Sequence, residues 1–165
     1  MRDDSHVESM DPNSVRKVVT VEAPQATAWR VFTEGMSTWW PLAQYKIGQA
    51  NAVAAIVEPF AGGRWYERGE DGSTCDWGRV VAWEPPARLV LTWDIGADWK
   101  YDPVLGTELE IRFIAEGDRR TRVELEHRRL DRYGARRDEM REIFDKGGDW
   151  GRLLARFAEV AAHGS

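Results

Sequence analysis

The stretch "YGARRDEMREIFDKGGDWGRLLARFAEVAA", residues 133–162, decides the fold. Its apolar residues recur three or four apart, which places them on one face of a helix. They are Met140, Ile143, Phe144, Gly147, Trp150, Leu153, Leu154, Phe157, Val160 and Ala161. Arginines and carboxylates occupy the opposite face. The spacing therefore predicts one long amphipathic helix from Tyr133 to Ala162.

Most of the chain before this helix alternates between apolar and polar residues, as β-strands do. Short helices are expected at about residues 26–33 and 36–40. The expected strands are residues 15–22, 53–58, 64–68, 73–84, 88–95, 107–115 and 121–130. A sheet and an amphipathic helix each need a partner to bury their apolar face. The sequence therefore predicts an α+β fold in which the sheet wraps around the long helix.

Two adjacent strands show most clearly which side chains face the helix. Residues 107–115 place Leu109, Ile111 and Phe113 on one face and charged residues on the other. Residues 121–130 do the same with Val123, Leu125 and His127. His127 is therefore expected on the covered, helix-facing side of an antiparallel sheet.

Gly147-Gly148 interrupts the predicted helix. Each glycine costs about 1 kcal/mol of helix stability relative to alanine. Either the helix kinks here, or the glycines allow its backbone to approach the sheet or a ligand closely.

Length and composition favour one folded domain over residues 15–165, after a polar arm at residues 1–14 that is expected to be disordered. The net charge of −5 and the mixed charge pattern argue against nucleic-acid or membrane binding. A single cysteine, Cys75, excludes an internal disulfide, and no apolar run suits a membrane span or a signal peptide. A cytoplasmic protein is expected.

Two segments lack a regular pattern and are expected to be functional loops. They are Leu42–Ala52 and Gly96–Gly106, the second of which contains Trp99 and Tyr101. The opening of a cavity is expected between them.

Three segments resemble the activator of heat-shock protein 90 ATPase homologue-like family, within the START-like (SRPBCC, Bet v 1-like) superfamily. They are "VEAPQATAWRVFTEGMSTWW" at residues 21–40, "GGRWYERGEDGSTCDWGRVVAWEPPARLVLTW" at 62–93, and "GGDWGRLLARFAEV" at 147–160. The resemblance covers residues 15–162. It implies the helix-grip arrangement: a curved seven-stranded antiparallel sheet around a long C-terminal helix, with two short helices and an elongated cavity.

The resemblance implies binding of a lipid, steroid, polyketide or similar small molecule, and cyclase activity in a few members. The eukaryotic activators carry an additional N-terminal domain that contacts the chaperone. Here only the short polar arm occupies that place, which argues against chaperone activation.

Nine tryptophans are more than a core of this size needs for filling. Indoles suit cavity walls because they combine a large apolar surface with one polar N–H. The expected apolar wall is Trp40, Trp65, Trp77, Trp93, Trp99, Phe144 and Trp150. A packed core without a void, or a homodimer interface formed by exposed tryptophans, would also use such residues.

Three polar residues are candidates for orienting a ligand. His127 is either a functional base or a hydrogen-bonded structural residue. Glu67 shares a strand face with Trp65, so it is either buried with a partner such as Arg79 or His127, or solvated at the sheet rim. Arg79 alternates with Trp77, Val81 and Trp83 and is expected beside Trp77 in the cavity.

Neither a metal site nor a cofactor is expected, because paired ligand spacings and glycine-rich phosphate motifs are absent from the sequence. Cys75, next to Asp76, lacks the positive surroundings of a reactive thiol. The leading hypothesis is a protein that binds a small apolar or aromatic ligand. The alternatives are a cyclase or dehydratase that uses His127 or Glu67 as acid or base, and a module that binds a chaperone through the outer face of the sheet.

Overall fold

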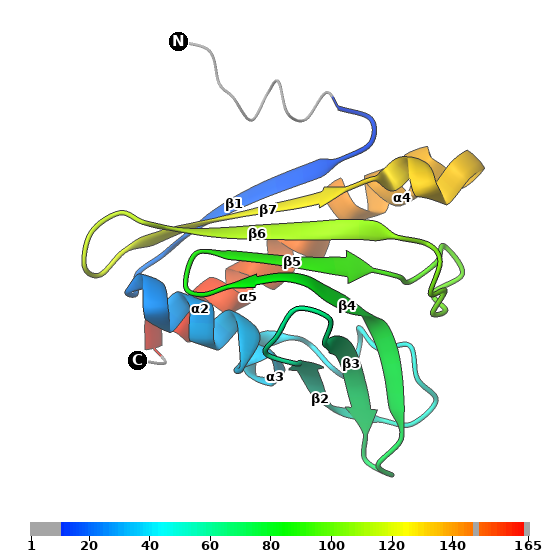
Figure 1. Cartoon of the computed structure of the whole chain (residues 1–165), viewed down its shortest axis with the longest axis horizontal. Helices are drawn as coiled ribbons and strands as arrows, with labels where there is room; N and C mark the ends of the chain where they lie inside the picture. Colours follow the sequence, from blue (N-terminus) through cyan, green and yellow to red (C-terminus); the bar gives the residue numbers. More distant parts are fainter. Residues whose placement is uncertain (1–10, 147–148, 164–165) are drawn as a thin grey trace.

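The computed structural model describes residues 11–146 and 149–163. Seven antiparallel strands form one sheet in the order β1-β7-β6-β5-β4-β3-β2 (Figure 1). They are β1 (Val15–Val21), β2 (Ala52–Val57), β3 (Arg64–Gly69), β4 (Thr74–Glu84), β5 (Arg88–Trp93), β6 (Thr107–Ala115) and β7 (Thr121–Arg128). The predicted α+β class and the number of strands are confirmed.

The two short helices lie at the expected places, whereas the single helix predicted from Tyr133 to Ala162 is replaced by three shorter segments. Two short ones, α2 (Gln25–Thr33) and α3 (Met36–Trp39), follow β1. The face predicted over residues 133–162 is divided between the 3₁₀-helix η1 (Leu130–Arg136), α4 (Arg137–Asp145) and the long α5 (Asp149–His163). Gly134, with φ 60° and ψ −127°, has a non-helical backbone inside η1. Among the described residues, every helix is too short or too polar to cross a membrane.

Gly147 and Gly148 lie outside the described residues. The choice between a kink and a close backbone approach at these glycines therefore stays a prediction.

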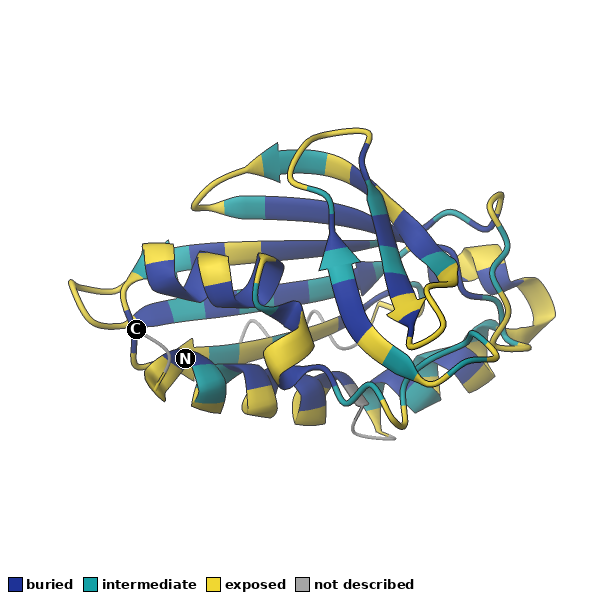
Figure 2. Ribbon diagram, turned by 90° about the horizontal axis from the view of Figure 1, so that it is seen from below, coloured by how far each residue is buried: buried dark blue, intermediate teal, exposed yellow. Residues whose placement is uncertain are grey.

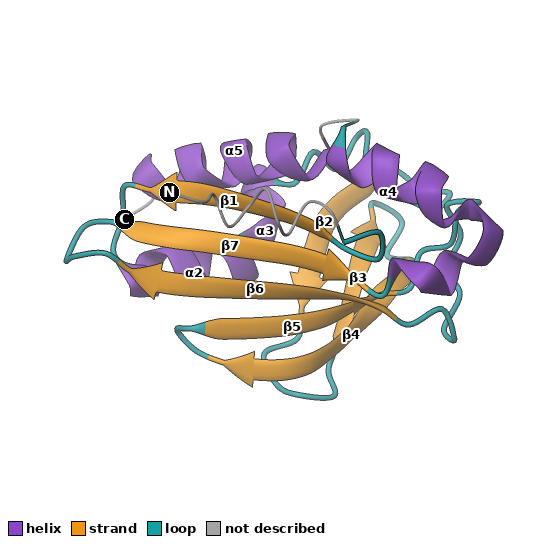
Figure 3. Cartoon of the chain, turned by 90° about the horizontal axis from the view of Figure 1, so that it is seen from above, coloured by secondary structure: helices purple, strands orange, loops and turns teal. Residues whose placement is uncertain are grey.

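The sheet curls so that both of its edges reach helices. At one edge β1 packs against α5, and at the other β2 packs against α3, which itself contacts α5. Figure 3 shows α5 and α4 along the β1 side of the sheet, with β2 and β3 crossing beneath them. The helix-grip arrangement implied by the sequence is confirmed.

The core lies between the inner face of the sheet and the helices. Leu109, Ile111 and Phe113 on β6 are buried, and so are Val123 and Leu125 on β7, as their alternation predicts. The outward sides of the helices are exposed, while their inward sides are buried (Figure 2). The structure thus confirms which face of the last two strands is covered.

Residues 11–14 correct the boundary of the predicted disordered arm. The backbone N–H of Leu130 donates to the carbonyl of Asn13 at 3.0 Å. Arg141 Nε lies 3.1 Å from the carbonyl oxygens of both Asp11 and Ser14. These bonds attach residues 11–14 to η1 and α4, so this part of the arm belongs to the folded domain.

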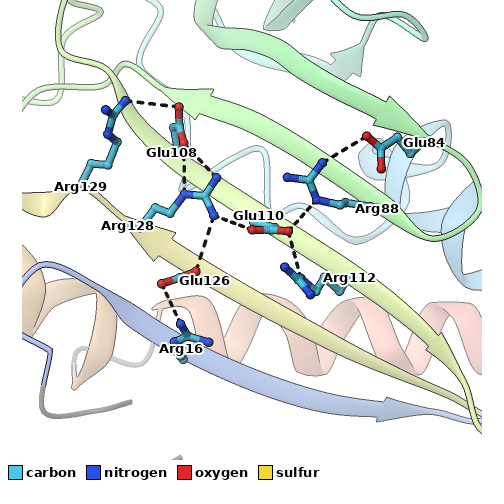
Figure 4. A network of polar contacts seen from close by, with 9 residues as sticks. All are labelled: Arg16, Glu84, Arg88, Glu108, Glu110, Arg112, Glu126, Arg128 and Arg129. Carbon is cyan, nitrogen blue, oxygen red and sulfur yellow. Dashed lines mark hydrogen bonds and ion pairs between the residues drawn. The ribbon is translucent and has the colours of Figure 1, made fainter. Parts of the chain in front are cut away.

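The outer face of the sheet is covered by a network of arginines and glutamates around one buried carboxylate (Figure 4). Glu110 on β6 is only 5% exposed. It accepts hydrogen bonds from Arg88 Nε at 2.7 Å, Arg112 Nε at 2.9 Å and Arg128 Nη1. Burial raises the pKa of Glu110, but the bonds from Arg88 and Arg128 and the charge of Arg112 outweigh burial and lower its pKa to about 2.

Replacing Glu110 by Gln should lower the free energy of unfolding by about 3 kcal/mol at pH 7, because three guanidinium groups lose their shared carboxylate. The Glu110 pKa falls from 4.5 to about 2 on folding, so its contribution is complete above pH 4.5 and is lost as the pH falls toward 2. Urea unfolding at pH 7, 5 and 3 measures the free energy of unfolding of the variant and of the wild type. The difference between these two free energies should shrink as the pH falls. Glu84→Gln is the control, because the Glu84 side chain is 57% exposed where it pairs with Arg88. Equal stability of the two variants would contradict this role of Glu110.

Candidate functional site

A cavity of about 330 Å³ lies between the inner face of the sheet, α4, α5 and two loops. The loop of residues 41–51, between α3 and β2, and the loop of residues 94–106, between β5 and β6, both contribute to its wall. The lining residues are Trp40, Gln44, Tyr45, Lys46, Ile47, Trp77, Trp93, Ile95, Trp99, Phe144, Trp150 and Leu153. Most of the wall is therefore aromatic or aliphatic.

The indoles of the wall contact one another in tilted or edge-to-face pairs. The ring centres of Trp40 and Trp77 are 5.0 Å apart, and those of Trp93 and Trp150 are 5.4 Å apart. Three of the indole N–H groups bond to the protein: Trp40 to the Tyr45 carbonyl at 2.9 Å, Trp77 to Glu67 at 2.8 Å and Trp150 to His127 at 3.2 Å. Because these three polar atoms are already paired, their rings offer mainly carbon surface to a ligand, whereas the buried Trp93 Nε1 has no hydrogen-bond partner among the described residues.

A β-bulge in β4 places Trp77 in the cavity wall. Trp65 pairs with Gly78 while the next residue of β3, Tyr66, pairs with Asp76, so Trp77 is the extra residue. Gly78 is required here, since a side-chain carbon would lie 1.9 Å from the Thr92 carbonyl oxygen.

The same bulge makes the prediction for Arg79 wrong. Strict alternation would place Arg79 beside Trp77, but one extra residue in the strand reverses the faces that follow. Arg79 is exposed and Val80 is buried in its place. A second irregularity between Val80 and Ala82 leaves Val81 49% exposed, so Val81 also lies outside the core.

His127 is fully buried behind the wall and does not line the cavity. Its Nδ1 accepts from Trp150 Nε1, and its Nε2 lies 3.1 Å from Thr107 Oγ1. The Thr107 hydroxyl donates to the Trp93 carbonyl, so the hydrogen-bond network assigns the proton to His127 Nε2. Burial lowers the pKa of His127 to about 3. His127 is therefore a neutral residue with both nitrogens paired, and it fixes the position of Trp150.

Glu67 on β3 is buried, and its partners differ from the predicted Arg79 or His127. Its carboxylate accepts from the backbone N–H of Ile47 at 2.7 Å, the N–H of Gly48 at 3.1 Å and Trp77 Nε1 at 2.8 Å. The backbone donors satisfy the buried charge without a cation. Glu67 thereby holds the 41–51 loop over the sheet and orients Trp77.

Trp65 lies behind the wall rather than in it. It is 1% exposed, its ring contacts those of Trp40, Trp77 and Trp93, and its Nε1 lies 3.3 Å from Met36 Sδ. Among the site residues predicted from the sequence, those that line the cavity are Trp40, Trp77, Trp93, Trp99, Phe144 and Trp150. Those that lie outside the wall are Trp65, Glu67, Arg79 and His127.

Trp99 differs from the other lining residues because it is 45% exposed. Its φ of 61° lies in the left-handed region, which is rare for a bulky residue. Its backbone N–H donates to the Gly96 carbonyl at 2.8 Å, which stabilises this turn. Trp99 therefore forms the solvent-exposed rim of the cavity.

Sequence reasoning missed the lining residues of the 41–51 loop, which include Gln44, Tyr45, Lys46 and Ile47. The irregular sequence of this loop is the feature that could have indicated them, since long irregular loops in compact domains tend to be functional. For Ile95 and Leu153, the sequence indicates only an apolar residue at a core position, so it does not predict that they line a cavity.

Cys75, on β4 beside Glu67 and Asp76, is half-buried. Burial raises the pKa of its thiol, and the charges of Glu67 and Asp76 raise it further. A high pKa disfavours the thiolate, so Cys75 is a poor nucleophile, as its sequence context predicts.

Residues 22–162 match the model of the family described as Activator of Hsp90 ATPase homolog 1-like protein. No sequence of a curated protein matches the chain. Among solved structures, the anthrahydroquino-gamma-pyrone synthase Txn09, complexed with SUM, is 37% identical over 92% of this chain and 99% of its own, with a TM-score of 0.63.

Two further structures show the same fold. The self-sacrificing resistance protein CalC from Micromonospora echinospora is 29% identical over 93% of this chain and 97% of its own, with a TM-score of 0.69. Protein MLL2253 from Mesorhizobium loti is 14% identical over 92% of this chain and 98% of its own, with a TM-score of 0.66. At 14% identity the likeness shows the fold alone.

Replacing Glu67 by Gln should loosen the 41–51 loop. The glutamine amide keeps one acceptor oxygen, but its NH₂ group replaces the other. A backbone N–H that now donates to the Glu67 carboxylate is then left without an acceptor, at a cost of about 1–3 kcal/mol. Amide hydrogen exchange of Ile47 and Gly48 should then be roughly tenfold faster or more, as a loss of 1.4 kcal/mol gives a factor of ten. The amides of Leu109 and Ile111 in β6 are the internal control, and unchanged exchange at Ile47 and Gly48 would contradict the assignment.

Proposed function

The chain belongs to the family described as Activator of Hsp90 ATPase homolog 1-like protein, and we propose that it is a small-molecule binding protein that holds an apolar or aromatic ligand in the cavity beneath the 41–51 loop. The observation that supports this proposal is the construction of the wall. Indoles from the C-cap of α3, from β4, from β5 and from α5 line one space. Apolar pockets lined by a few polar groups are typical of small-molecule sites.

The ligand we propose is a planar, fused-ring compound. Offset and edge-to-face contacts with aromatic rings favour a planar aromatic guest. A volume of about 330 Å³ is near the lower end of the range for ligand pockets, which favours a small molecule. The 37% identical relative is named for an anthrahydroquino-gamma-pyrone product, and this name supports a fused aromatic ligand here.

An enzyme of the cyclase kind is the second candidate, and the identity to a named synthase favours it. The positions of His127 and Glu67 argue against either as a simple acid or base, because both are hydrogen-bonded outside the cavity wall. Among the described lining residues, Tyr45 and Lys46 carry groups that can transfer a proton. Mass spectrometry of an added fused-ring substrate, before and after incubation, distinguishes turnover from binding alone.

Replacing Trp99 by Ala should weaken binding of 2-naphthamide by about tenfold, since one aromatic contact contributes roughly 0.5–1.5 kcal/mol beyond its buried area. Isothermal titration calorimetry measures the Kd, and the melting temperature should stay unchanged because Trp99 is half exposed. Phe60→Ala is the control, because Phe60 is 53% exposed and does not line the cavity.

Two results would contradict the proposed function. One is wild-type affinity in the Trp99→Ala variant. The other is a wild-type protein that does not bind 2-naphthamide but does bind a purified heat-shock protein 90 homologue. That result would favour a chaperone as the partner.

A further inference from the structure

The cavity wall carries one ionised side chain among the described residues that line it, and that side chain is the lysine of the 41–51 loop, Lys46. The remaining polar side chains of the wall, Gln44 and Tyr45, are neutral in ordinary conditions. Glu67 is the carboxylate that anchors this loop, and its oxygens are already engaged by three N–H donors. The described lining residues therefore carry one positive charge and no negative charge.

Among the described residues, the Lys46 ammonium has one hydrogen-bond partner. Its Nζ donates to the Gly48 carbonyl at 2.7 Å, and among the described residues it forms no ion pair. An ammonium group has three N–H donors, so two remain for water or a ligand. A half-buried cation beside apolar surface gains most from a group that restores its lost hydration.

The loop holds Lys46 in a fixed place. On one side, Trp40 Nε1 donates to the carbonyl of the preceding residue, Tyr45. On the other side, Glu67 accepts from the two following residues, Ile47 and Gly48. Because the backbone is bonded on both sides of Lys46, little further ordering is needed when a ligand binds, and preorganised groups bind more tightly.

We propose that the ligand of this cavity is an aromatic carboxylate, whose ring system packs among the indoles and whose two carboxylate oxygens accept the two remaining N–H donors of Lys46. This inference rests on the proposed function and adds the charge of the ligand to it. Two free donors match the two oxygens of one carboxylate, and a charge-assisted bond in a mainly apolar site is stronger than a neutral one.

Three ligands and four proteins test the proposal by isothermal titration calorimetry at pH 7. 2-Naphthoate is the probe, 2-naphthamide has the same shape without the charge, and 1-methylnaphthalene is the apolar reference. Wild-type protein should bind 2-naphthoate about tenfold more tightly than 2-naphthamide. Lys46→Met should abolish this preference while leaving the Kd of 2-naphthamide within about twofold of wild type.

Lys100→Met is the matched control, because Lys100 is an exposed lysine on the 94–106 loop that does not line the cavity. It removes the same charge and should keep the tenfold preference. Lys46→Gln serves as the second variant and should behave as Lys46→Met, and circular dichroism establishes that each variant is folded.

The outcomes separate the two proposals. Equal affinity of the wild type for the acid and the amide, or a preference that survives in Lys46→Met, would overturn the carboxylate inference and leave the cavity as a site for neutral aromatic ligands. Failure of all three naphthalenes to bind the wild type would overturn the proposed function and this inference together.

Discussion

A buried carboxylate needs hydrogen-bond donors, and at Glu67 that need joins the parts of the candidate site. Its oxygens accept from Ile47 and Gly48 in the 41–51 loop and from Trp77 in β4, while Glu67 itself belongs to β3. These bonds fix the loop and one indole relative to the sheet. Without them the loop would lose its attachment to β3, and the cavity would lose one of its walls.

The second constraint is the bulge in β4. Gly78 allows the Thr92 carbonyl to approach where any side chain would clash, and the extra residue turns Trp77 toward the helices. Elsewhere in the site, His127 uses one nitrogen to hold Trp150 and the other to contact Thr107. Trp77 and Trp150 are therefore both positioned by buried polar groups that do not line the cavity.

The sequence was sufficient for the architecture because periodicity reports which side chains are buried. Leu109, Ile111 and Phe113 alternate without interruption, and their strand spans the predicted residues 107–115. Arg79 shows where this reasoning ends, since a one-residue bulge reverses the face and leaves no trace in local composition beyond Gly78. Lys46 and Glu67 show a second limit: their roles depend on contacts between the 41–51 loop and β3, which a pattern within one strand does not report.

The most direct test follows the nine indole N–H signals in a ¹⁵N-correlated NMR spectrum while 2-naphthamide is added. If the ligand enters the cavity, the signals of Trp40, Trp77, Trp93, Trp99 and Trp150 should shift. Those of Trp29 and Trp83, which pack on each other outside the cavity wall, should stay in place. Shifts confined to Trp29 and Trp83, or no shifts at ligand saturation, would contradict binding in this cavity.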